Sequence, residues 1–407
     1  MFEAFSFPPC IGISRKRRRD QTIAYQFIKQ GRNRELESCD KNLMKEIISV
    51  APMMDWTDRH FRYMMRGITK CTALYTEMVV DTTIHHQASN LDFFIGKEIF
   101  ENPSVIQVGG HDPDSVSSAA HICSQYGDYS EINLNCGCPS PRVSLRSFGA
   151  KLMLEPELVR EIAAKTIRMV SQPVTIKCRI GVDKKDSYED LCHFINTVSQ
   201  SGVKKFIIHA RKCILKGLTT KQNRDIPPLR YDIPHKLVQD YPDLTFILNG
   251  GLQTFDQIDT HLGYNIVDHN IYSPPASFPN SYLHPVHGCM IGRAAYNNPF
   301  LLATVDSTYY HQPDPCLTRR QVVERYLDYC DRIQSDEGPV RYVNGNEQKI
   351  STPFLLKPMH SVFNGCQGIN RYRVAANDLY IERRRLHIGG QGTEPTPREV
   401  VSDSKRR

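Results

Sequence analysis

The sequence contains no long uninterrupted apolar segment. None of its apolar runs approaches the roughly 18 residues of a membrane-spanning helix, and hydrophobic residues make up 40% of the chain. We therefore predict a protein without membrane association. At 407 residues, the chain is long enough for one large domain with a sizeable core and a smaller second domain.

The sequence also lacks the cysteine spacings of a metal site or a disulfide framework. Its 13 cysteines are an odd number and include no C-x-x-C pair. This usage favours a reducing compartment over secretion and predicts no bound metal. Cys136 and Cys138 form a C-x-C pair, but no second cluster accompanies it.

An acidic excess is absent as well, because the net charge is +7. This balance permits a polyanionic partner without requiring one. Residues 1–45 carry the basic run Arg15–Arg19 and little periodicity, and we predict a disordered leader there. Nuclear targeting, organelle targeting and an RNA tether are alternatives for this leader. For the whole chain we expect a cytoplasmic monomer.

From about residue 47, short apolar runs alternate with amphipathic stretches, which is typical of β-α units around a parallel sheet. The runs are Ile47–Met53, Leu74–Val80, Val105–Val108, Glu131–Leu134, Val174–Cys178, Lys205–His209, Thr245–Leu248 and Met290–Ile291 with its flanks. Eight runs predict an α/β fold, a closed (β/α)8 TIM barrel, over residues 46–312. The main alternative is an open doubly wound sheet, but no G-x-G-x-x-G follows the first run. Helices are expected over 157–170 and 188–199.

The pattern changes near the end of the predicted barrel. Residues 267–286 are rich in Pro, Ser and Asn and are predicted to be a loop inserted before the last strand. A smaller all-helical domain is predicted over 313–390 and a disordered tail over 391–407. The helices are expected at 319–334, 353–363 and 370–384. Basic residues at Arg371, Arg373 and Arg383–Arg385 indicate either a solvated face or a surface that contacts phosphates.

One predicted strand ends abruptly within Glu131–Val143. Pro139 has no backbone N–H and keeps Cys138 out of the helical region, while Gly137 lets the chain bend. Taken alone, Cys138 is better explained as a core cysteine, because free cysteine is among the most buried residue types. The ends of the other strands favour a chemical role instead.

Glycine and arginine residues follow the last two strands of the predicted barrel. Asn249, Gly250 and Gly251 follow the seventh run, and Gly292 and Arg293 follow the eighth. In such barrels the active site lies at the carboxyl ends of the strands, and phosphates commonly bind after strands seven and eight. Glycine N–H groups and an arginine fork suit phosphate oxygens. We therefore predict a phosphate site.

The remaining strand ends carry side chains suited to a flat ring. They include Pro52, Met53, Gln107, Lys177, Arg179, His209 and Arg211. A buried lysine without a purpose is uncommon, so Lys177 is expected to face a ligand. Together with the phosphate site, these residues predict flavin mononucleotide (FMN), because Lys177 near the pyrimidine edge stabilises an anionic reduced ring. Cys138, opposite the lysine, is then an acid rather than a nucleophile.

Seven ordered motifs carry a resemblance to a known family. They are A-P-M-M-D-W-T-D-R-H-F-R (Ala51–Arg62), L-N-C-G-C-P-S (Leu134–Ser140), F-G-A-K-L-M (Phe148–Met153), K-C-R-I-G (Lys177–Gly181), I-H-A-R-K (Ile208–Lys212), N-G-G (Asn249–Gly251) and I-G-R-x-A-Y-x-N-P (Ile291–Pro299). From about residue 47 to the C-terminal helices, the chain closely resembles the tRNA-dihydrouridine synthases, most of all their A subfamily, the tRNA-dihydrouridine(20/20a) synthases.

The resemblance implies an FMN-bound barrel and a helical domain that grips tRNA, with NADPH as the reductant. Hydride would go to C6 of a D-loop uridine, and Cys138 would protonate C5. The implied FMN residues are Pro52, Met53, Met54, Gln107, Lys177, His209, Asn249, Gly250, Gly251, Gly292 and Arg293. The implied tRNA residues are Asn135, Lys221, Arg224 and Arg373. The alternatives are an FMN barrel reductase of a small enone or pyrimidine, and a non-catalytic RNA binder.

The chain departs from the family pattern at several positions. Cys136 replaces a small aliphatic residue, which raises the question of a mixed or strained thiol pair on oxidation. Leu145 and Arg146 replace an Asn-Gly pair, and Asn370 replaces an arginine. These differences concern the positioning of the substrate more than the chemistry.

Overall fold

The computed structural model describes residues 46–404 with nine interruptions. The omitted residues are 145–146, 264–283, 336–339, 344–345, 368, 372, 375–377, 379–380 and 382–394. The predicted leader, Leu145 and Arg146, most of the predicted insertion and most of the predicted helix at 370–384 therefore lie outside the described residues.

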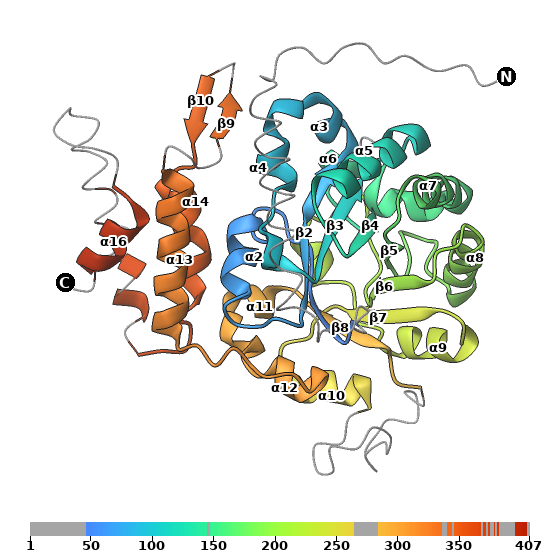
Figure 1. Cartoon of the computed structure of the whole chain (residues 1–407). Coiled ribbons are helices and arrows are strands. Elements are labelled where there is room, and N and C mark those ends of the chain that lie inside the picture. The colour runs from blue at the N-terminus through green and yellow to red at the C-terminus, as the bar shows by residue number, and fades with distance from the viewer. Residues whose placement is uncertain are drawn as a thin grey trace. The chain divides into compact units, whose positions relative to one another are not determined.

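Eight parallel strands close into a barrel in chain order (Figure 1). They are β1 (Ile48–Val50), β2 (Ala73–Val80), β3 (Ser104–Gly109), β4 (Glu131–Cys136), β5 (Val174–Arg179), β6 (Lys205–His209), β7 (Thr245–Asn249) and β8 (Gly288–Ile291). The barrel closes where β1 pairs with β8, with Ile48 opposite Cys289 and Val50 opposite Ile291. Each predicted apolar run contributes to one strand, so the TIM barrel is confirmed.

Helices connect the strands and surround the barrel (Figure 1). They are α2 (Arg59–Met65), α3 (Asp81–His86), α4 (Leu91–Ile95), α5 (Pro113–Tyr126), α6 (Pro141–Ser144), α7 (Pro156–Met169), α8 (Tyr188–Ser199), α9 (Asp232–Asp240), α10 (Phe255–Leu262), α11 (Arg293–Asn297) and α12 (Val305–Tyr310). Helix α8 has the predicted bounds because Ser187 and Asp190 form a reciprocal capping box at its start. Helix α7 lies one residue before its predicted span.

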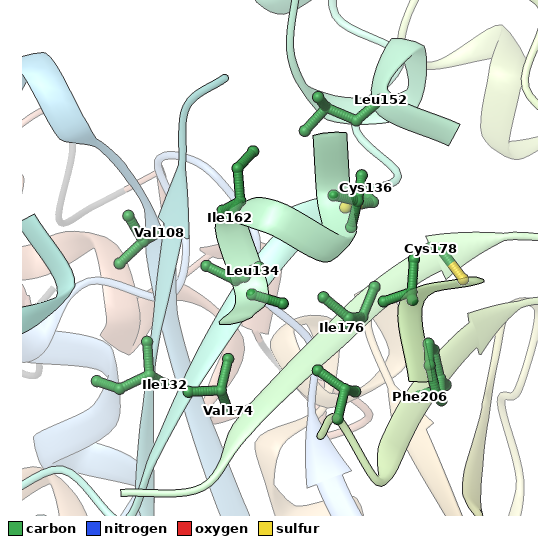
Figure 2. Packing of buried hydrophobic residues seen from close by; sticks show 14 of the residues in the cluster. Val108, Ile132, Leu134, Cys136, Leu152, Ile162, Val174, Ile176, Cys178 and Phe206 are labelled. Atoms are coloured by element: carbon green, nitrogen blue, oxygen red, sulfur yellow. The ribbon is translucent and has the colours of Figure 1, made fainter. Parts of the chain in front are cut away.

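The alternation of residues along β4 separates the two faces of the barrel wall. Ile132, Leu134 and Cys136 belong to the apolar core that also contains Leu152 and Ile162 (Figure 2). Glu131, Asn133 and Asn135 occupy the alternate positions, and their side chains bond across to neighbouring strands. Because side chains on a strand alternate between faces, one short segment supplies both the core and the polar interior.

A charged cluster lies at the amino ends of the strands. The Lys205 ammonium bonds to the Glu46 carboxylate at 2.6 Å and contacts the Glu131 carboxylate. The Tyr75 hydroxyl lies 3.2 Å from an oxygen of each carboxylate. Both glutamate side chains are 7% exposed, whereas that of Lys205 is 19% exposed. Burial raises the pKa of Glu131, and Lys205 opposes this shift.

Replacing Lys205 by methionine is expected to lower the free energy of unfolding by about 2–4 kcal/mol at pH 7, because two buried carboxylates lose their shared cation. Urea unfolding of the purified chain measures the change. Lys204→Met is the matched control, because Lys204 is exposed. The loss should shrink at acidic pH, where protonation removes one negative charge. An equal loss in both variants would contradict the role of Lys205.

The C-terminal region is packed against the barrel through α13 (Arg319–Gln334), which lies beside α2 (Figure 1). Val322 and Tyr326 of α13 share an apolar core with Phe61 of α2. The His60 ring nitrogen Nδ1 and the Tyr329 hydroxyl lie 2.7 Å apart in a buried hydrogen bond. Helix α13 has the predicted bounds. The predicted helix at 353–363 is observed as α14 (Thr352–Leu356) followed by a 3₁₀ turn over Lys357–Ser361.

The C-terminal region is helical as predicted, with one local exception. Strands β9 (Val340–Val343) and β10 (Asn346–Lys349) form an antiparallel pair. The Asn90 side chain accepts a hydrogen bond from the Tyr342 N–H at 2.7 Å and donates one to its carbonyl at 3.0 Å. A contact so distant in sequence stabilises extended backbone that local helical patterning does not anticipate.

The structure places helix α16, Pro397–Ser404, within the segment 391–407 that was predicted to be a disordered tail. Val400 and Val401 are buried in the core that α13 shares with the barrel. The Arg398 guanidinium bonds to the carboxylates of Asp328 and Asp331 on α13. Two adjacent valines and one arginine therefore dock this short helix. No helix among the described residues is both long and apolar enough to cross a membrane.

Candidate active site

A cavity of about 780 Å³ lies at the carboxyl ends of the barrel strands. All eleven predicted cofactor residues line it: Pro52, Met53, Met54, Gln107, Lys177, His209, Asn249, Gly250, Gly251, Gly292 and Arg293. Cys138, Asn135 and Arg224 line it too. These residues are dispersed over 242 sequence positions, and the parallel barrel gathers them because all its strands end at the same rim.

Cys138 enters the cavity from the loop after β4. The Asn135 side-chain oxygen accepts hydrogen bonds from the N–H groups of Gly137 at 3.2 Å and Cys138 at 3.0 Å. The Cys138 carbonyl accepts a further bond from the Ala150 N–H at 3.0 Å. These bonds fix the turn that carries the thiol, so Cys138 is positioned from both sides of its peptide.

The Cys138 thiol is held in its protonated form. Burial raises its pKa above the ordinary value for cysteine, while the Ser140 N–H and the charges of Arg179 and Lys177 oppose the shift. At neutral pH the side chain is therefore a thiol and can donate a proton. This state suits an acid better than a nucleophile.

Cys136 has a different environment from Cys138. It is 1% exposed and packs in the apolar core between the strands and helices (Figure 2). Burial raises its pKa well above the ordinary value, and the neighbouring Cys178 adds to the shift. The residue that departs from the family pattern is therefore a packing residue outside the cavity lining.

Lys177 places a cation in the cavity. Its ammonium donates to the Asn249 side-chain oxygen at 2.9 Å, and the Asn249 amide donates to the Met290 carbonyl at 2.8 Å. Burial, and then the charge of Arg179, lower the Lys177 pKa to about 8. The lysine is therefore mostly charged at neutral pH. An anionic ligand bound beside it would raise its pKa and stabilise the charged form.

A chain of amide groups fixes the neighbouring wall. The Gln107 amide donates to Asn133 at 2.8 Å, and its oxygen accepts from Asn135 at 2.8 Å. Asn133 in turn donates to the Thr175 hydroxyl at 2.9 Å, which donates to Glu131 at 2.6 Å. This network connects the cavity wall to the charged cluster beneath it and orients the Gln107 and Asn135 side chains.

The loop after β7 requires glycine. Gly250 and Gly251 have φ angles of +116° and +73°, which favour glycine. A Cβ at Gly250 would lie 2.7 Å from the His209 ring. At the adjacent strand, Arg293 opens α11 and pairs with Asp225 at 2.9 Å. The backbone can therefore approach a ligand closely here, with a guanidinium beside it.

Two other arginines extend the positive character of the cavity. Arg179 is buried and donates to the carbonyls of Gly137 at 2.9 Å, Asn223 at 3.0 Å and Lys212 at 3.1 Å. It therefore ties the Cys138 loop to the loop after β6. Arg224 has a buried Nε that finds no hydrogen-bond partner within the described part of the chain, so it offers an unused donor.

Two of the predicted tRNA residues lie outside the cavity lining. Lys221 is exposed at the start of the 3₁₀ turn Gln222–Arg224, next to the lining residue Thr220. Arg373 lies in the C-terminal region, where its Nε donates to the His360 carbonyl at 2.8 Å. Both remain predictions as RNA contacts.

The sequence interpretation placed Arg179 among the strand-end residues but missed Trp56 as a cavity residue. Trp56 had no local signal, because its place depends on Tyr296, whose ring stacks against it at 4.3 Å. Within the described ranges, no group of three or more His, Cys, Asp or Glu side chains is arranged to hold a metal ion.

The closed barrel and the polar cavity at its strand ends define the class: a (β/α)8-barrel enzyme with its active site at the carboxyl ends of the strands. Residues 49–273 match the family model described as dihydrouridine synthase (Dus). The chain belongs to the dihydrouridine synthase family and is an oxidoreductase acting on CH–CH groups.

Three relatives illustrate the extent of the similarity, each named tRNA-dihydrouridine(20/20a) synthase. The chain is 42% identical to that of a Synechocystis species over 78% of this chain and 84% of the relative. It is 39% identical to that of Pasteurella multocida over 85% and 93%. It is 41% identical to that of Shewanella oneidensis over 87% and 93%.

Proposed function

We propose that this protein reduces uridine to 5,6-dihydrouridine in the D-loop of tRNA, with FMN as the cofactor and NADPH as the reductant. The observation that carries the proposal is the pairing of a protonated thiol, Cys138, with a cation, Lys177, in one cavity. The relatives' names, which specify tRNA positions 20 and 20a, support the choice of substrate.

The cavity fits FMN on structural grounds. Gly250 and Gly251 line the cavity in left-handed backbone conformations that favour glycine, so no side chain at these positions separates their backbone from a ligand. Gly250, Gly251, Gly292 and Arg293 would hold the phosphate. Lys177 and Gln107 would hold the polar edges of the ring. When bound and reduced by NADPH, FMN would supply the hydride for uracil C6.

The protein's own contribution to the reaction is to hold and deliver a proton. Burial keeps the Cys138 thiol protonated until it is needed, and Asn135 fixes the loop that aims it. Cys138 would donate its proton to C5, the carbon next to the C6 that receives the hydride. The target base must leave its stack to reach this position, at a cost of a few kcal/mol.

Positive side chains at and near the cavity would bind the RNA backbone. Arg224 lines the cavity, Lys221 lies beside it, and Arg373 extends the set onto the C-terminal region. Asn135 would approach the target base. A small-molecule reductase would have little use for cations placed so far outside its pocket.

Lys221→Ala and Arg373→Ala are each expected to weaken tRNA binding and to lower the slope of log Kd against log salt concentration by about one, because each removes one phosphate contact. Filter binding measures the slope. The salt concentration is varied over roughly 50 to 200 mM, where the affinity depends strongly on phosphate contacts. Lys204→Ala is the control, since Lys204 precedes β6 at the amino end of the barrel. Unchanged slopes for both variants would remove these residues from the interface.

The proposed function is tested with the purified full-length chain. We expect a yellow protein whose released flavin is FMN and which forms dihydrouridine in unmodified tRNA with NADPH. Free uridine, dihydroorotate-like pyrimidines and simple enones serve as competing substrates. Turnover of one of these small molecules with no reaction on tRNA would favour the alternative reductase. A colourless protein that binds tRNA normally would favour a non-catalytic RNA binder.

A further inference from the structure

Two stacked aromatic rings lie at one wall of the cavity, and a third ring packs behind them. Trp56 follows β1, and Tyr296 lies in α11 after β8, so the pairing of β1 with β8 brings them together. The two rings stack at 4.3 Å with an interplanar angle of 14°. The Phe61 ring, which is fully buried, lies 5.3 Å from Tyr296 in a tilted arrangement, at an interplanar angle of 35°. The Trp56 ring is therefore supported from the core.

The Trp56 side chain reaches the cavity, whereas Tyr296 does not line it. Tyr296 covers one face of the indole, and Trp56 itself borders the open space. Two further cavity residues lie two positions from the stacked rings in the sequence: Met54, which is 55% exposed, and Asn298, whose buried side-chain oxygen has no hydrogen-bond partner among the described residues. An aromatic surface, a flexible apolar side chain and an unused acceptor are together suited to a nucleobase.

The same wall adjoins the C-terminal region of the chain. The Lys357 ammonium bonds to the Asp55 carbonyl, one residue before Trp56. The Asn364 amide donates to the carbonyl of Asn297, another cavity residue, at 2.7 Å. A ligand that leaves the cavity over Trp56 therefore passes onto a surface that carries Lys357. This continuity favours a polynucleotide over a mononucleotide, because only a polynucleotide has further phosphates to place there.

We propose that the Trp56–Tyr296 stack binds the base of a nucleotide directly adjoining the target uridine. This inference rests on the proposed function and adds a specificity determinant to it. When the target base leaves its stack, the face of the neighbouring base loses its partner. The Trp56 indole replaces that partner and so holds the RNA strand in the opened conformation. Asn298 accepts a hydrogen bond from the edge of the docked base.

The first test replaces Trp56 and, as a control, an aromatic residue far from the cavity. Trp56→Leu should weaken the affinity of the FMN-loaded protein for tRNA by roughly 5- to 150-fold, the range expected for one base–aromatic stack. Trp56→Phe should lose less. The control is Phe100→Leu, because Phe100 is 44% exposed and precedes β3 at the amino end of the barrel. If wild type forms dihydrouridine and Trp56→Leu binds tRNA with equal affinity, the stacking role is overturned and the proposed function is not. Absence of dihydrouridine in wild type overturns the proposed function instead.

The second test removes the base rather than the indole. A tRNA with an abasic site immediately 5′ or 3′ of the target uridine should bind wild type more weakly at one of the two positions. The same abasic tRNA should lose little further affinity with Trp56→Leu, since the two changes remove one interaction. Fully additive losses, or no loss at either position, would overturn the assignment.

A third measurement needs no variant to fold. Trp56 is the chain's single tryptophan, so the indole emission of the whole protein reports on this site. Titration of the FMN-loaded protein with tRNA should change that emission with the same Kd as filter binding, because stacking on a base quenches an indole. Saturated tRNA binding with unchanged emission contradicts the proposal.

Discussion

Replacing Cys138 by alanine is expected to lower the rate of dihydrouridine formation by about 10²- to 10⁴-fold, the range for removal of a general acid. FMN binding and tRNA binding should stay close to wild type. The reason is that Cys138 lines the cavity with its proton held in place by burial, while the cofactor cradle is built from other strand ends. Single-turnover assays with pre-reduced protein measure the chemical step directly.

Cys136→Ala is the matched control for this experiment. It removes a thiol two residues away that packs in the apolar core and is 1% exposed. We expect some loss of stability, because a buried sulfur leaves a small void, but normal activity per folded protein. Full activity of Cys138→Ala, or an equal loss of activity in both variants, would contradict the assignment of Cys138 as the acid.

Replacing Lys177 by methionine is expected to have the second largest effect, with a loss of roughly 10²- to 10³-fold in the rate of NADPH-dependent reduction of the bound flavin. Removal of one preorganised charge from a site of charge development typically costs this much. The Lys177 ammonium donates a hydrogen bond to the Asn249 side-chain oxygen at 2.9 Å, which fixes its position. Burial and the charge of Arg179 lower its pKa, so an anionic ligand would stabilise its charged form. Stopped-flow absorbance of the flavin follows the step. Lys151→Met, whose lysine bonds to Ser147 outside the cavity lining, is the control.

The same substitution should stabilise the cofactor-free protein at neutral pH. Because the Lys177 pKa is lowered to about 8 in the folded chain, folding disfavours its charged form below that pH. The penalty is fully present below pH 8 and fades as the pH rises toward the ordinary lysine value. Lys177→Met should therefore gain about 1–3 kcal/mol of unfolding free energy at pH 7 and little at pH 10. A loss of stability at pH 7 would show that Lys177 supports the fold rather than a ligand.

The barrel could be predicted from the sequence because its signals are local. Each strand is a short apolar run. The capping box at Ser187 marks the start of α8 at the same residue as the helical periodicity of the sequence. The hairpin β9–β10 and helix α16 could not be predicted in this way. Tyr342 is held by Asn90, 252 residues earlier, and Arg398 by Asp328, 70 residues earlier. Neither segment has a strong pattern of its own.

The candidate site was predictable for a different reason. Strand ends meet at one rim in a parallel barrel, so Gln107, Lys177 and His209 could be grouped without knowing their distances. The direction of a side chain beyond the strand end was less accessible. Cys136 and Cys138 are two residues apart, but the turn fixed by Asn135 sends only Cys138 into the cavity. The aromatic stack at Trp56 depends on a contact with residue 296 and needed the structure.

The central claim is the conversion of a D-loop uridine in tRNA by a chemistry that depends on Cys138. Its most direct test is to map dihydrouridine at single-nucleotide resolution in tRNA from cells that lack this protein and carry either the wild-type chain or Cys138→Ala. We predict dihydrouridine in the D-loop with the wild-type chain, at positions 20 and 20a as in the relatives' names, and none there with Cys138→Ala. Restoration by both chains, or by neither, would contradict the account.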